Sequence, residues 1–229
     1  MQAETPHVML TKNTTPLSPD IIQRALREFQ LQATPEQVIA IQQYMAMLLA
    51  WNEKVNLTAI RDPVEVLYRH FCESMYAKVA VPSLGGRLAD VGSGAGFPGL
   101  ALKIACPELH VFLIESNVKK ATFLAEMVRE IELGDTRVLV SRYEELGEEI
   151  TPIDIVCSRA LGEFDKFLGW ARSERVAASQ AILWVGGRDV EEIRQIEGWN
   201  WKRPVPIPHS LQRFLLIGDR EGESPKSSE

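Results

Sequence analysis

The sequence predicts an α/β fold in which a parallel sheet, covered by helices on both faces, follows a helical extension. From Arg87 onwards, short apolar runs alternate with helix-like segments, which is typical of βαβ units. The first apolar run, Leu88–Val91, passes directly into a glycine-rich turn and then a helix pattern. Before residue 85, three proline-containing helix starts predict the extension.

Composition limits the protein class. The chain has 229 residues, 45% of them hydrophobic, enough for one full core. No apolar run approaches the roughly 20 residues that cross a membrane, and the amino terminus lacks a signal-peptide pattern. The three cysteines form no C-x-x-C pair and the four histidines are scattered, so we expect a reducing cytoplasm and no metal. The net charge of −6 argues against broad non-specific nucleic-acid binding.

Four segments are predicted: a disordered tail over 1–17, the helical extension over 18–84, the α/β domain over 85–220 and a disordered tail over 221–229. In the extension, helices begin after the caps Ser18, Thr34 and Asp62, each followed by proline. The third helix is expected to bury Leu67, Phe71 and Met75 on one face.

The α/β domain alternates strands and helices. Helices are expected around 98–105, 118–132, 163–176 and 189–196. The segment 199–208 contains three prolines and is expected to be an irregular crossing or an edge. The predicted strands are Leu88–Val91, Val111–Glu115, Arg137–Ser141, Ile153–Ser158, Ala181–Val185 and Phe214–Ile217.

The glycine turn carries two overlapping patterns. Gly94–Gly99 matches G-x-G-x-x-G, the dinucleotide fingerprint. Asp90–Gly96 matches D-x-G-x-G-x-G, which resembles motif I of class I S-adenosylmethionine methyltransferases, and the acid before the first glycine favours that interpretation. A plain βα turn without a ligand is the third possibility. The candidate cofactor residues here are Gly92, Gly94, Gly96 and Phe97.

The next strand ends supply further candidates, since ligands of open α/β sheets bind beyond the carboxyl ends of the strands. Glu115, about twenty residues beyond the turn, suits both ribose hydroxyls, or it caps a helix. Tyr143 and Glu144 follow the third strand and suit an adenine ring and its amino group, or they begin a helix. Lys119 and Lys120 either meet RNA phosphate or are solvated.

The fourth strand ends in Cys157-Ser158-Arg159, where Arg159 either contacts a ligand or forms a structural ion pair. Motifs typical of exocyclic-amine and cytosine-C5 methylation are absent there, and Cys157 is either a nucleophile or a buried apolar residue. Guanine N7 fits this absence, because its lone pair is free at neutral pH and no base must remove a proton. In-line placement is then the main requirement.

These residues resemble a family. The runs DVGSGAGFPG, WNEKVNLTAI, RHFCESM, IESNVKKATFL, SRYEE and VCSRA are similar, in order and spacing, to the RsmG (GidB) 16S ribosomal RNA guanine-N7 methyltransferases, over about Leu48 to Ala160. The resemblance implies a class I, Rossmann-like methyltransferase sheet with an N-terminal helical extension, S-adenosylmethionine as cofactor, and a guanine near the decoding region as substrate. It implies cofactor contacts at Gly92, Phe97, Tyr143, Glu144 and Arg159, and an RNA-facing side at Asn52, Asn56, Arg69 and His70.

Two departures concern charged residues. The family pattern His-x-x-Asp-Ser-Leu reads His70-Phe71-Cys72-Glu73-Ser74-Met75 here. Where the family often has Lys-Gly-Gly, this chain has Gly186-Gly187-Arg188, so Arg188 is an RNA candidate together with Arg142.

The leading hypothesis is an rRNA guanine-N7 methyltransferase with Arg159 as its catalytic residue. Its partner would be 16S rRNA or the small ribosomal subunit, with no membrane or metal, and we expect a cytoplasmic monomer. The alternatives are a small-molecule methyltransferase, which the negative charge favours, and a non-catalytic S-adenosylmethionine-binding protein. A nicotinamide dehydrogenase is disfavoured because no acid–base pair for hydride chemistry is evident.

Overall fold

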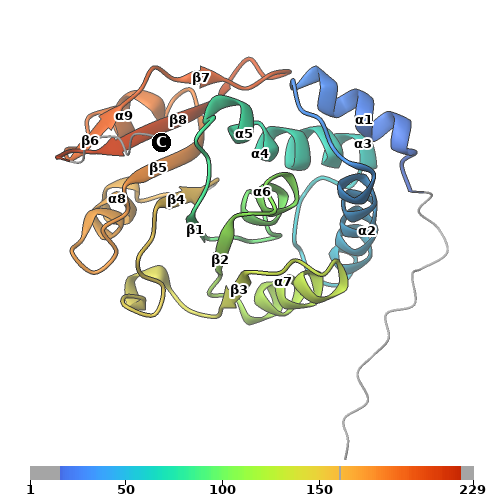
Figure 1. Ribbon diagram of the computed structural model, residues 1–229, viewed down its shortest axis with the longest axis horizontal. Coiled ribbons are helices and arrows are strands. Elements are labelled where there is room, and N and C mark those ends of the chain that lie inside the picture. The colour runs from blue at the N-terminus through green and yellow to red at the C-terminus, as the bar shows by residue number, and fades with distance from the viewer. Residues whose placement is uncertain (1–15, 160, 223–229) are drawn as a thin grey trace, which may run out of the picture.

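The computed structural model describes residues 16–159 and 161–222, which form one mixed sheet with helices on both faces (Figure 1). The strand order is β3-β2-β1-β4-β5-β8-β6, and β7 pairs with β8. The strands are β1 (Arg87–Val91), β2 (His110–Ile114), β3 (Thr136–Leu139), β4 (Ile155–Ser158), β5 (Gln180–Gly186), β6 (Trp199–Trp201), β7 (Val205–Pro206) and β8 (Arg213–Arg220). The order reverses between the neighbours β1 and β4, so the switch point of the sheet lies there.

The first five strands are parallel, but β8 runs antiparallel to β5, β6 and β7. The predicted parallel pairing is therefore confirmed for β1–β5, whereas β8 runs in the opposite direction. Only residues 207–212 separate β7 from β8, and a parallel return needs a crossover of about a dozen residues. The proline-containing segment 199–208 supplies β6 and β7 at this end of the sheet.

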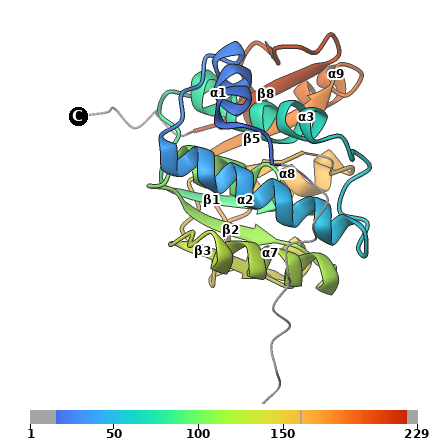
Figure 2. The same ribbon diagram turned by 90° about the vertical axis from the view of Figure 1, so that its right-hand side faces the viewer.

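Helices cover the two faces unequally (Figure 1). The α-helices are α1 (Pro19–Glu28), α2 (Pro35–Asn52), α3 (Pro63–Val66), α4 (Glu73–Met75), α5 (Ala77–Ala80), α6 (Gly99–Ala105), α7 (Val118–Glu130), α8 (Phe164–Arg172) and α9 (Val190–Arg194). Helices α1, α2, α6 and α7 share one hydrophobic core with the sheet, and Figure 2 shows α2 and α7 extending along it. Helices α8 and α9 share the second core with the other face.

Alternation along each strand produces these two cores. In β1, Leu88 points into the core of the first face and Ala89 into that of the second. In β4, Ile155 lies in the core of the first face and Val156 in the core of the second. Both faces are apolar because both are covered, as expected for a sheet of parallel strands.

The predicted helix starts in the extension are confirmed. Ser18 and Asp62 accept hydrogen bonds from the first turns of α1 and α3. Thr34 and Gln37 form a reciprocal capping box at α2, with backbone-to-side-chain distances of 2.9 and 3.3 Å. Such caps satisfy N–H groups that have no partner within the helix.

The third predicted helix is interrupted by a π-helical segment, η1 (Leu67–Cys72), between α3 and α4. Its predicted apolar residues are nevertheless all buried. The π segment carries Arg69 and His70. Wide turns of this kind are often found at functional sites.

The disordered tails predicted over 1–17 and 221–229 lie outside the described residues, except for residues 16–17 and 221–222. In the described part, no helix is long and apolar enough to span a bilayer. The three cysteines are buried and unbridged.

Candidate active site

The predicted cofactor residues follow the carboxyl ends of neighbouring strands. The glycine turn follows β1, and Glu115 follows β2. On the other side of β1, the hydroxyl of Ser158 at the end of β4 donates to the carbonyl of Val91, 2.9 Å away. The backbone of Arg159, the next residue, therefore lies beside the glycine turn. The structure thus brings the β1, β2 and β4 candidates to one edge, at the switch point.

The glycine turn needs backbone that most residues avoid. The φ angles are +72° at Gly92, +57° at Gly94 and +91° at Gly96. A Cβ on Gly94 would meet only the carbonyl oxygen of Gly92, at 3.8 Å, so that side of the turn is open. Open glycine backbone of this kind lets a ligand approach the main chain.

Gly96 faces the protein instead of the open side. The hydroxyl of Tyr44 on α2 donates to the carbonyl of Ala95, and a Cβ on Gly96 would overlap that hydroxyl and Leu100. The close approach of Tyr44 and Leu100 therefore leaves no space for a side chain at position 96. The structure gives this predicted cofactor residue a packing role.

Glu115 ties the turn to the next helix. Its Oε2 accepts from the N–H of Gly94 at 2.9 Å, and its Oε1 accepts from the N–H of Asn117 at 2.7 Å. The side chain of Asn117 in turn caps α7, because it accepts hydrogen bonds from the backbone N–H groups of Lys119 and Lys120. A carboxylate has about four lone-pair sites, so Glu115 keeps acceptor capacity for two hydroxyls.

Asp90 lies beneath the turn and was not named as a site residue from the sequence. It is fully buried, and its Oδ2 accepts from the N–H of Gly99 at 2.9 Å, at the start of α6. Burial raises the pKa of this carboxyl to about 7, although the hydrogen bond from Gly99 opposes the shift. The acid of the D-x-G-x-G-x-G pattern thus joins β1 to α6.

Phe97 connects the turn to the helical extension. Its ring stacks between Tyr44, with centroids 5.1 Å apart, and His70, 4.8 Å apart. Burial, followed by the charges of Arg159 and Arg69, lowers the pKa of His70 to about 3, so the imidazole is neutral. Its Nε2 lies 2.7 Å from the hydroxyl of Thr58. His70 therefore packs as a neutral ring rather than as a cation.

Asn52, which the family resemblance places on the RNA-facing side, is bonded within its own loop. It is buried, its Nδ2 donates to the carbonyl of Thr58, and its Oδ1 accepts from the N–H groups of Leu57 and Thr58. The side chain thus holds the loop after α2. Asn56, on that loop, is exposed.

Tyr143 and Glu144 form a short 3₁₀ turn after β3, η2 (Tyr143–Glu145). The Tyr143 ring packs edge-on against Phe167 and Trp170 of α8. Glu144 pairs with Lys166 at 2.6 Å, which lowers the pKa of the carboxyl. Both side chains therefore have protein partners, and the backbone of the turn lies next to the edge.

Arg159 is held by the extension. Its Nη2 donates to Glu73 Oε2 at 3.1 Å and its Nη1 to the hydroxyl of Ser74 at 3.3 Å. Burial lowers the pKa of Arg159 to about 10, which leaves the guanidinium charged at neutral pH.

Glu73 is the centre of a cluster that the sequence did not reveal. Glu73 as a whole is 2% exposed. Its carboxylate also lies 3.3 Å from Nε of Arg69 and accepts hydrogen bonds of 3.0–3.1 Å from Nε of Arg213. We call Arg69, Glu73, Arg159 and Arg213 the arginine cluster. The one available signal was the motif departure at Glu73, because Arg213 is 140 residues away in the chain.

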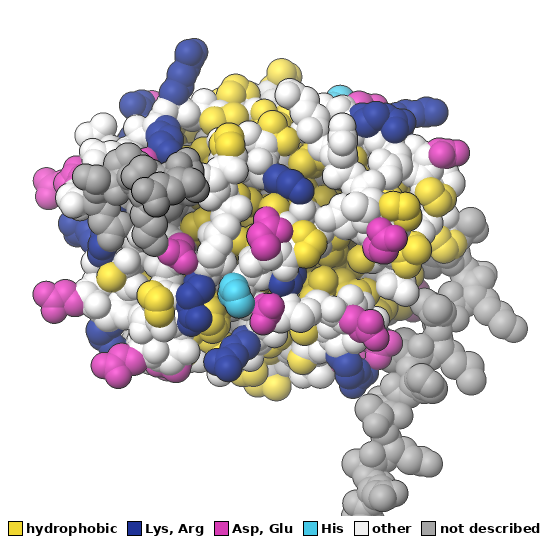
Figure 3. Space-filling model, in the orientation of Figure 1, with side chains coloured by type: hydrophobic (Ala, Val, Ile, Leu, Met, Phe, Trp, Pro, Cys, Tyr) yellow, Lys and Arg dark blue, Asp and Glu magenta, His cyan; other side chains and the backbone are white. Residues whose placement is uncertain are grey.

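The other basic candidates do not gather at one place. Lys119, Lys120 and Arg142 follow β2 and β3, whereas the exposed Arg188 follows β5, on the other side of β1 and β4 in the strand order. Figure 3 shows acidic and basic side chains interspersed over one face of the molecule. Broad single-sign attraction of RNA is therefore not evident on that face.

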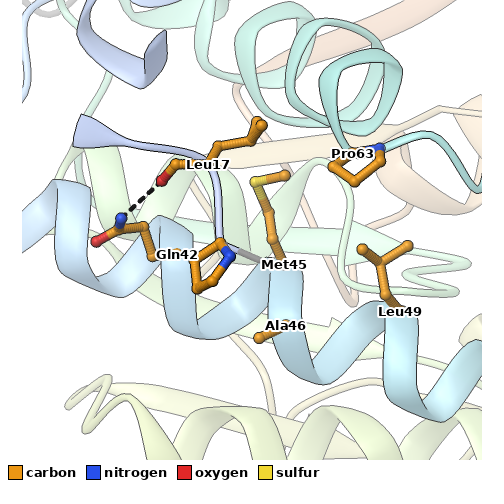
Figure 4. Close-up of a pocket in the computed structure, with 7 residues that line it drawn as sticks. Leu17, Gln42, Met45, Ala46, Leu49 and Pro63 are labelled. Carbon is orange, nitrogen blue, oxygen red and sulfur yellow. Dashed lines mark hydrogen bonds between the residues drawn. The ribbon is translucent and has the colours of Figure 1, made fainter. Parts of the chain in front are cut away.

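The edge fits S-adenosylmethionine better than a metal. It offers open glycine backbone, an acid with free acceptor sites and backbone N–H groups. Within residues 16–159 and 161–222, no group of three or more His, Cys, Asp or Glu residues suits a metal ion. A separate small hollow beside α2, lined by Leu17, Met45 and Pro63 among others, contains none of the predicted site residues (Figure 4).

Sequence comparisons point to one family. A family model described as rRNA small subunit methyltransferase G (GidB) matches residues 37–200. Ribosomal RNA small subunit methyltransferase G of Xanthomonas euvesicatoria pv. vesicatoria is 42% identical over 210 residues, covering 91% of this chain and 96% of that protein. The protein of the same name from Xylella fastidiosa is 42% identical over 183 residues, covering 80% and 84%.

Solved structures support the fold. A SAM dependent methyltransferase from Aquifex aeolicus aligns with a TM-score of 0.56 at 19% identity, over 71% of this chain and 96% of that one. A ribosomal protein L11 methylase from Lactobacillus delbrueckii subsp. bulgaricus aligns with a TM-score of 0.53 at 14% identity, over 67% and 79%. The class I fold and the cofactor expected from the glycine turn are confirmed. This chain belongs to the rRNA small subunit methyltransferase G family of S-adenosylmethionine-dependent enzymes.

Proposed function

We propose that this chain transfers a methyl group from S-adenosylmethionine to N7 of a guanine in 16S ribosomal RNA. The observation that carries the choice of N7 is the burial of Cys157 and His70, two side chains near the β1–β4 switch point that could otherwise act as nucleophile or base. Cys157 is fully buried, and burial raises the pKa of its thiol well above the usual range, so it is no nucleophile for cytosine C5. His70 is neutral but buried, and its pKa of about 3 makes it a weak base.

N7 of guanine suits such a site. Its lone pair is free at neutral pH, so methylation there needs neither a base nor a covalent intermediate. What the protein must supply is placement of the base. In A-form RNA the groove that contains N7 is too deep and narrow for side chains to read, so a loop base is the expected target.

The proposed cofactor residues are Gly92, Gly94, Phe97, Glu115, the Tyr143–Glu144 backbone and Arg159. When bound, S-adenosylmethionine supplies an activated sulfonium methyl group. Glu115 accepts hydrogen bonds from hydroxyl groups, and the open side of Gly94 permits close approach. Phe97 holds the turn against α2 and His70. Arg159 orients an anionic or guanine edge at the switch point.

The partner is proposed to be 16S rRNA, free or within the small subunit, and the enzyme a cytoplasmic monomer. Asn56, Arg69, Lys119, Lys120, Arg142 and Arg188 remain the proposed RNA-facing residues. The alternatives are a small-molecule methyltransferase, which the net charge of −6 favours, and a non-catalytic S-adenosylmethionine-binding protein.

Methyl transfer from labelled cofactor separates these functions. The substrates are small ribosomal subunits and free 16S rRNA from a strain that lacks the modification. We expect labelled 7-methylguanosine after nuclease digestion, and loss of it with Arg159→Ala. The matched control is Arg129→Ala, which removes an exposed arginine paired with Glu130 at the far end of α7. An unlabelled RNA digest from the wild-type protein would contradict the proposal.

A further inference from the structure

Arg213 belongs to the edge that carries the candidate active site. Strand β8 is antiparallel to β5, and its first residue, Arg213, pairs with Gly186 at the carboxyl end of β5. The beginning of β8 therefore lies at the same edge as the ends of β1, β2 and β4. Sequence reasoning had assigned no role to this strand start.

The side chain of Arg213 reaches Glu73 with two of its nitrogens. Nε donates to both carboxylate oxygens, at 3.1 and 3.0 Å, and Nη2 donates to Oε1 at 2.5 Å. This fork orients the guanidinium, since both ends of the carboxylate are engaged. A buried glutamate thus determines where an arginine from another part of the chain points.

The cluster has more positive than negative charge. Glu73 is surrounded by three guanidiniums, and among residues 16–159 and 161–222 the only other carboxylate paired with them is the half-exposed Glu65, 3.8 Å from Arg69. Three cations against two anions leave an excess of one positive charge. His70 beside them is neutral, because its pKa is about 3. The cluster can therefore accept a further anion.

Two of the guanidiniums are available to solvent. The side chains of Arg69 and Arg213 are 37% and 27% exposed. The hydrogen bonds of Arg213 to described residues use Nε and Nη2, so Nη1 keeps both of its N–H donors. Arg159 is more enclosed, at 17%. Arg213 thus combines free N–H donors with partial exposure to solvent.

We propose that Arg213 and Arg69 bind a backbone phosphate of the RNA substrate, and that Glu73 is the positioning residue that orients them. This inference rests on the proposed function. The order β1-β4-β5-β8 places β8 three strands from the glycine turn, roughly 14 Å at the usual strand spacing. Arg213 therefore approaches Arg159 from the side opposite the cofactor residues, where the RNA chain flanking the target guanine would lie.

The neighbouring loop extends this surface. The N–H of Gly187 donates to the carbonyl of Gln212 at 2.8 Å, which brings the exposed Arg188 beside the loop before β8. Leu211 in that loop is 99% exposed. Two neighbouring loops at this edge of the sheet thus carry Arg188, Leu211 and Arg213. Their cationic and apolar groups suit the phosphates and bases of a nucleotide chain.

The test measures RNA and cofactor binding separately. Arg213→Gln, Arg213→Lys and Arg69→Gln are compared with the wild-type protein and with Arg129→Gln, an arginine paired with glutamate at the opposite edge. Methylation of unmodified small subunits gives KM and kcat. Filter binding to the same subunits over a potassium chloride series gives the salt slope, and calorimetry with S-adenosylhomocysteine gives cofactor affinity.

For Arg213→Gln we expect KM for the subunits to rise about tenfold, with kcat within about twofold. The slope of log affinity against log salt should become shallower by about 0.7, the value for one phosphate contact in single-stranded RNA. Cofactor affinity should not change. Arg213→Lys should keep the salt slope but lose part of the affinity for small subunits, since lysine retains the charge but lacks the paired N–H donors of the guanidinium. A general loss of folding would not produce this combination.

Two outcomes would overturn the inference. If wild-type methylates the subunits and Arg213→Gln keeps the wild-type KM and salt slope, the phosphate does not bind there, although the proposed function holds. If Arg213→Gln weakens S-adenosylhomocysteine instead, the anion is the carboxylate of the cofactor. Failure of the proposed function is distinguishable, because then the wild-type protein itself methylates no RNA.

Discussion

The two halves of the candidate site are built in different ways. The glycine turn with Glu115 is made by residues close in sequence, and its contacts are mostly from backbone N–H groups. The arginine cluster joins η1, α4, the end of β4 and the start of β8, and its contacts are between charged side chains. A short sequence specifies the first half, whereas only the complete sheet assembles the second.

This difference has an energetic counterpart. A hydrogen bond from a backbone N–H group to the ionised carboxylate of Glu115 contributes about 1.5–3 kcal/mol. A buried carboxylate among three guanidiniums is favourable only while its partners remain, because the carboxylate itself is desolvated. We therefore expect substitution of Glu73, the buried centre of the arginine cluster, to have the largest effect on folding, and substitutions at the glycine turn to divide between folding and cofactor binding.

Glu73→Gln should break the arginine cluster most severely. Removing the charge leaves three guanidiniums that repel one another, so the free energy of unfolding should fall by about 3–5 kcal/mol. Urea denaturation at neutral pH measures it. Glu73→Asp, which keeps the charge, should lose less than half as much, and Glu65→Gln, at the half-exposed partner of Arg69, less than about 1 kcal/mol. An equally small loss for Glu73→Gln would show that the cluster does not depend on this carboxylate.

Gly96→Ala and Gly94→Ala should have different effects, because Gly96 faces the protein and Gly94 faces the open side of the glycine turn. A methyl group on Gly96 would overlap Tyr44 and Leu100 in a left-handed conformation, lowering the free energy of unfolding by about 2–4 kcal/mol. Gly94 has space, so the loss should be about 1–2 kcal/mol, but affinity for S-adenosylhomocysteine should fall more. Gly134→Ala, with no atom nearby, is the control and should be neutral. The reverse ranking of stabilities would contradict this division.

Asp90→Asn should change how stability depends on pH. Burial of His70, with a pKa of about 3, makes the unfolded chain bind more protons below pH 6.5, so stability falls as pH falls from about 6.5 towards 3. Asp90, with a pKa of about 7, makes the folded protein bind more protons, so stability falls as pH rises from about 4 to 7. The two effects oppose each other in wild type between about pH 4 and pH 6.5.

Asn at position 90 keeps the acceptor for the Gly99 N–H but cannot titrate. Between about pH 4 and pH 6.5, the free energy of unfolding of the variant should therefore increase with pH. The slope should exceed that of the wild-type protein by up to about 1.4 kcal/mol per pH unit. Urea unfolding at several pH values measures both profiles. Parallel profiles would mean that Asp90 is not protonated in the folded protein near neutral pH.

Lys119→Gln with Lys120→Gln should have the smallest effect. These lysines lie at the cofactor half of the edge, exposed or half-exposed, where salt screens them. We expect RNA affinity to fall about two- to threefold, less than for Arg213→Gln, with cofactor affinity unchanged. Filter binding to small subunits compares them. If the lysine variant loses more RNA affinity than Arg213→Gln, the RNA binds mainly along the cofactor half of the edge.

The sequence predicted the half of the site that local patterns encode. Gly92–Gly96 and Glu115 follow predicted strands at a spacing set by one βαβ unit, so their proximity needed no tertiary information. The strand ends and most helices were also foreseen, because amphipathic periodicity and caps are local. The roles given to the individual site residues stay predictions.

The arginine cluster and the direction of β8 could not be predicted in this way. Pairing Arg213 with Glu73 depends on β8 returning antiparallel beside β5, and no local pattern encodes that direction. The burial of Asn52 and its bonds within its own loop could not be predicted either, because polarity alone does not distinguish a side chain that binds a ligand from one that holds its own loop.

The late position of β8 in the chain has a consequence for biosynthesis. Chains are made from the amino terminus and their parts begin to fold in that order. While β8 is still to come, the glycine turn, Glu115 and Arg159 already exist, but Glu73 lacks the arginine that holds it most closely and β5 lacks its outer neighbour. A nascent chain can thus form the cofactor half first, and the half that we propose for RNA becomes complete only near the end of translation.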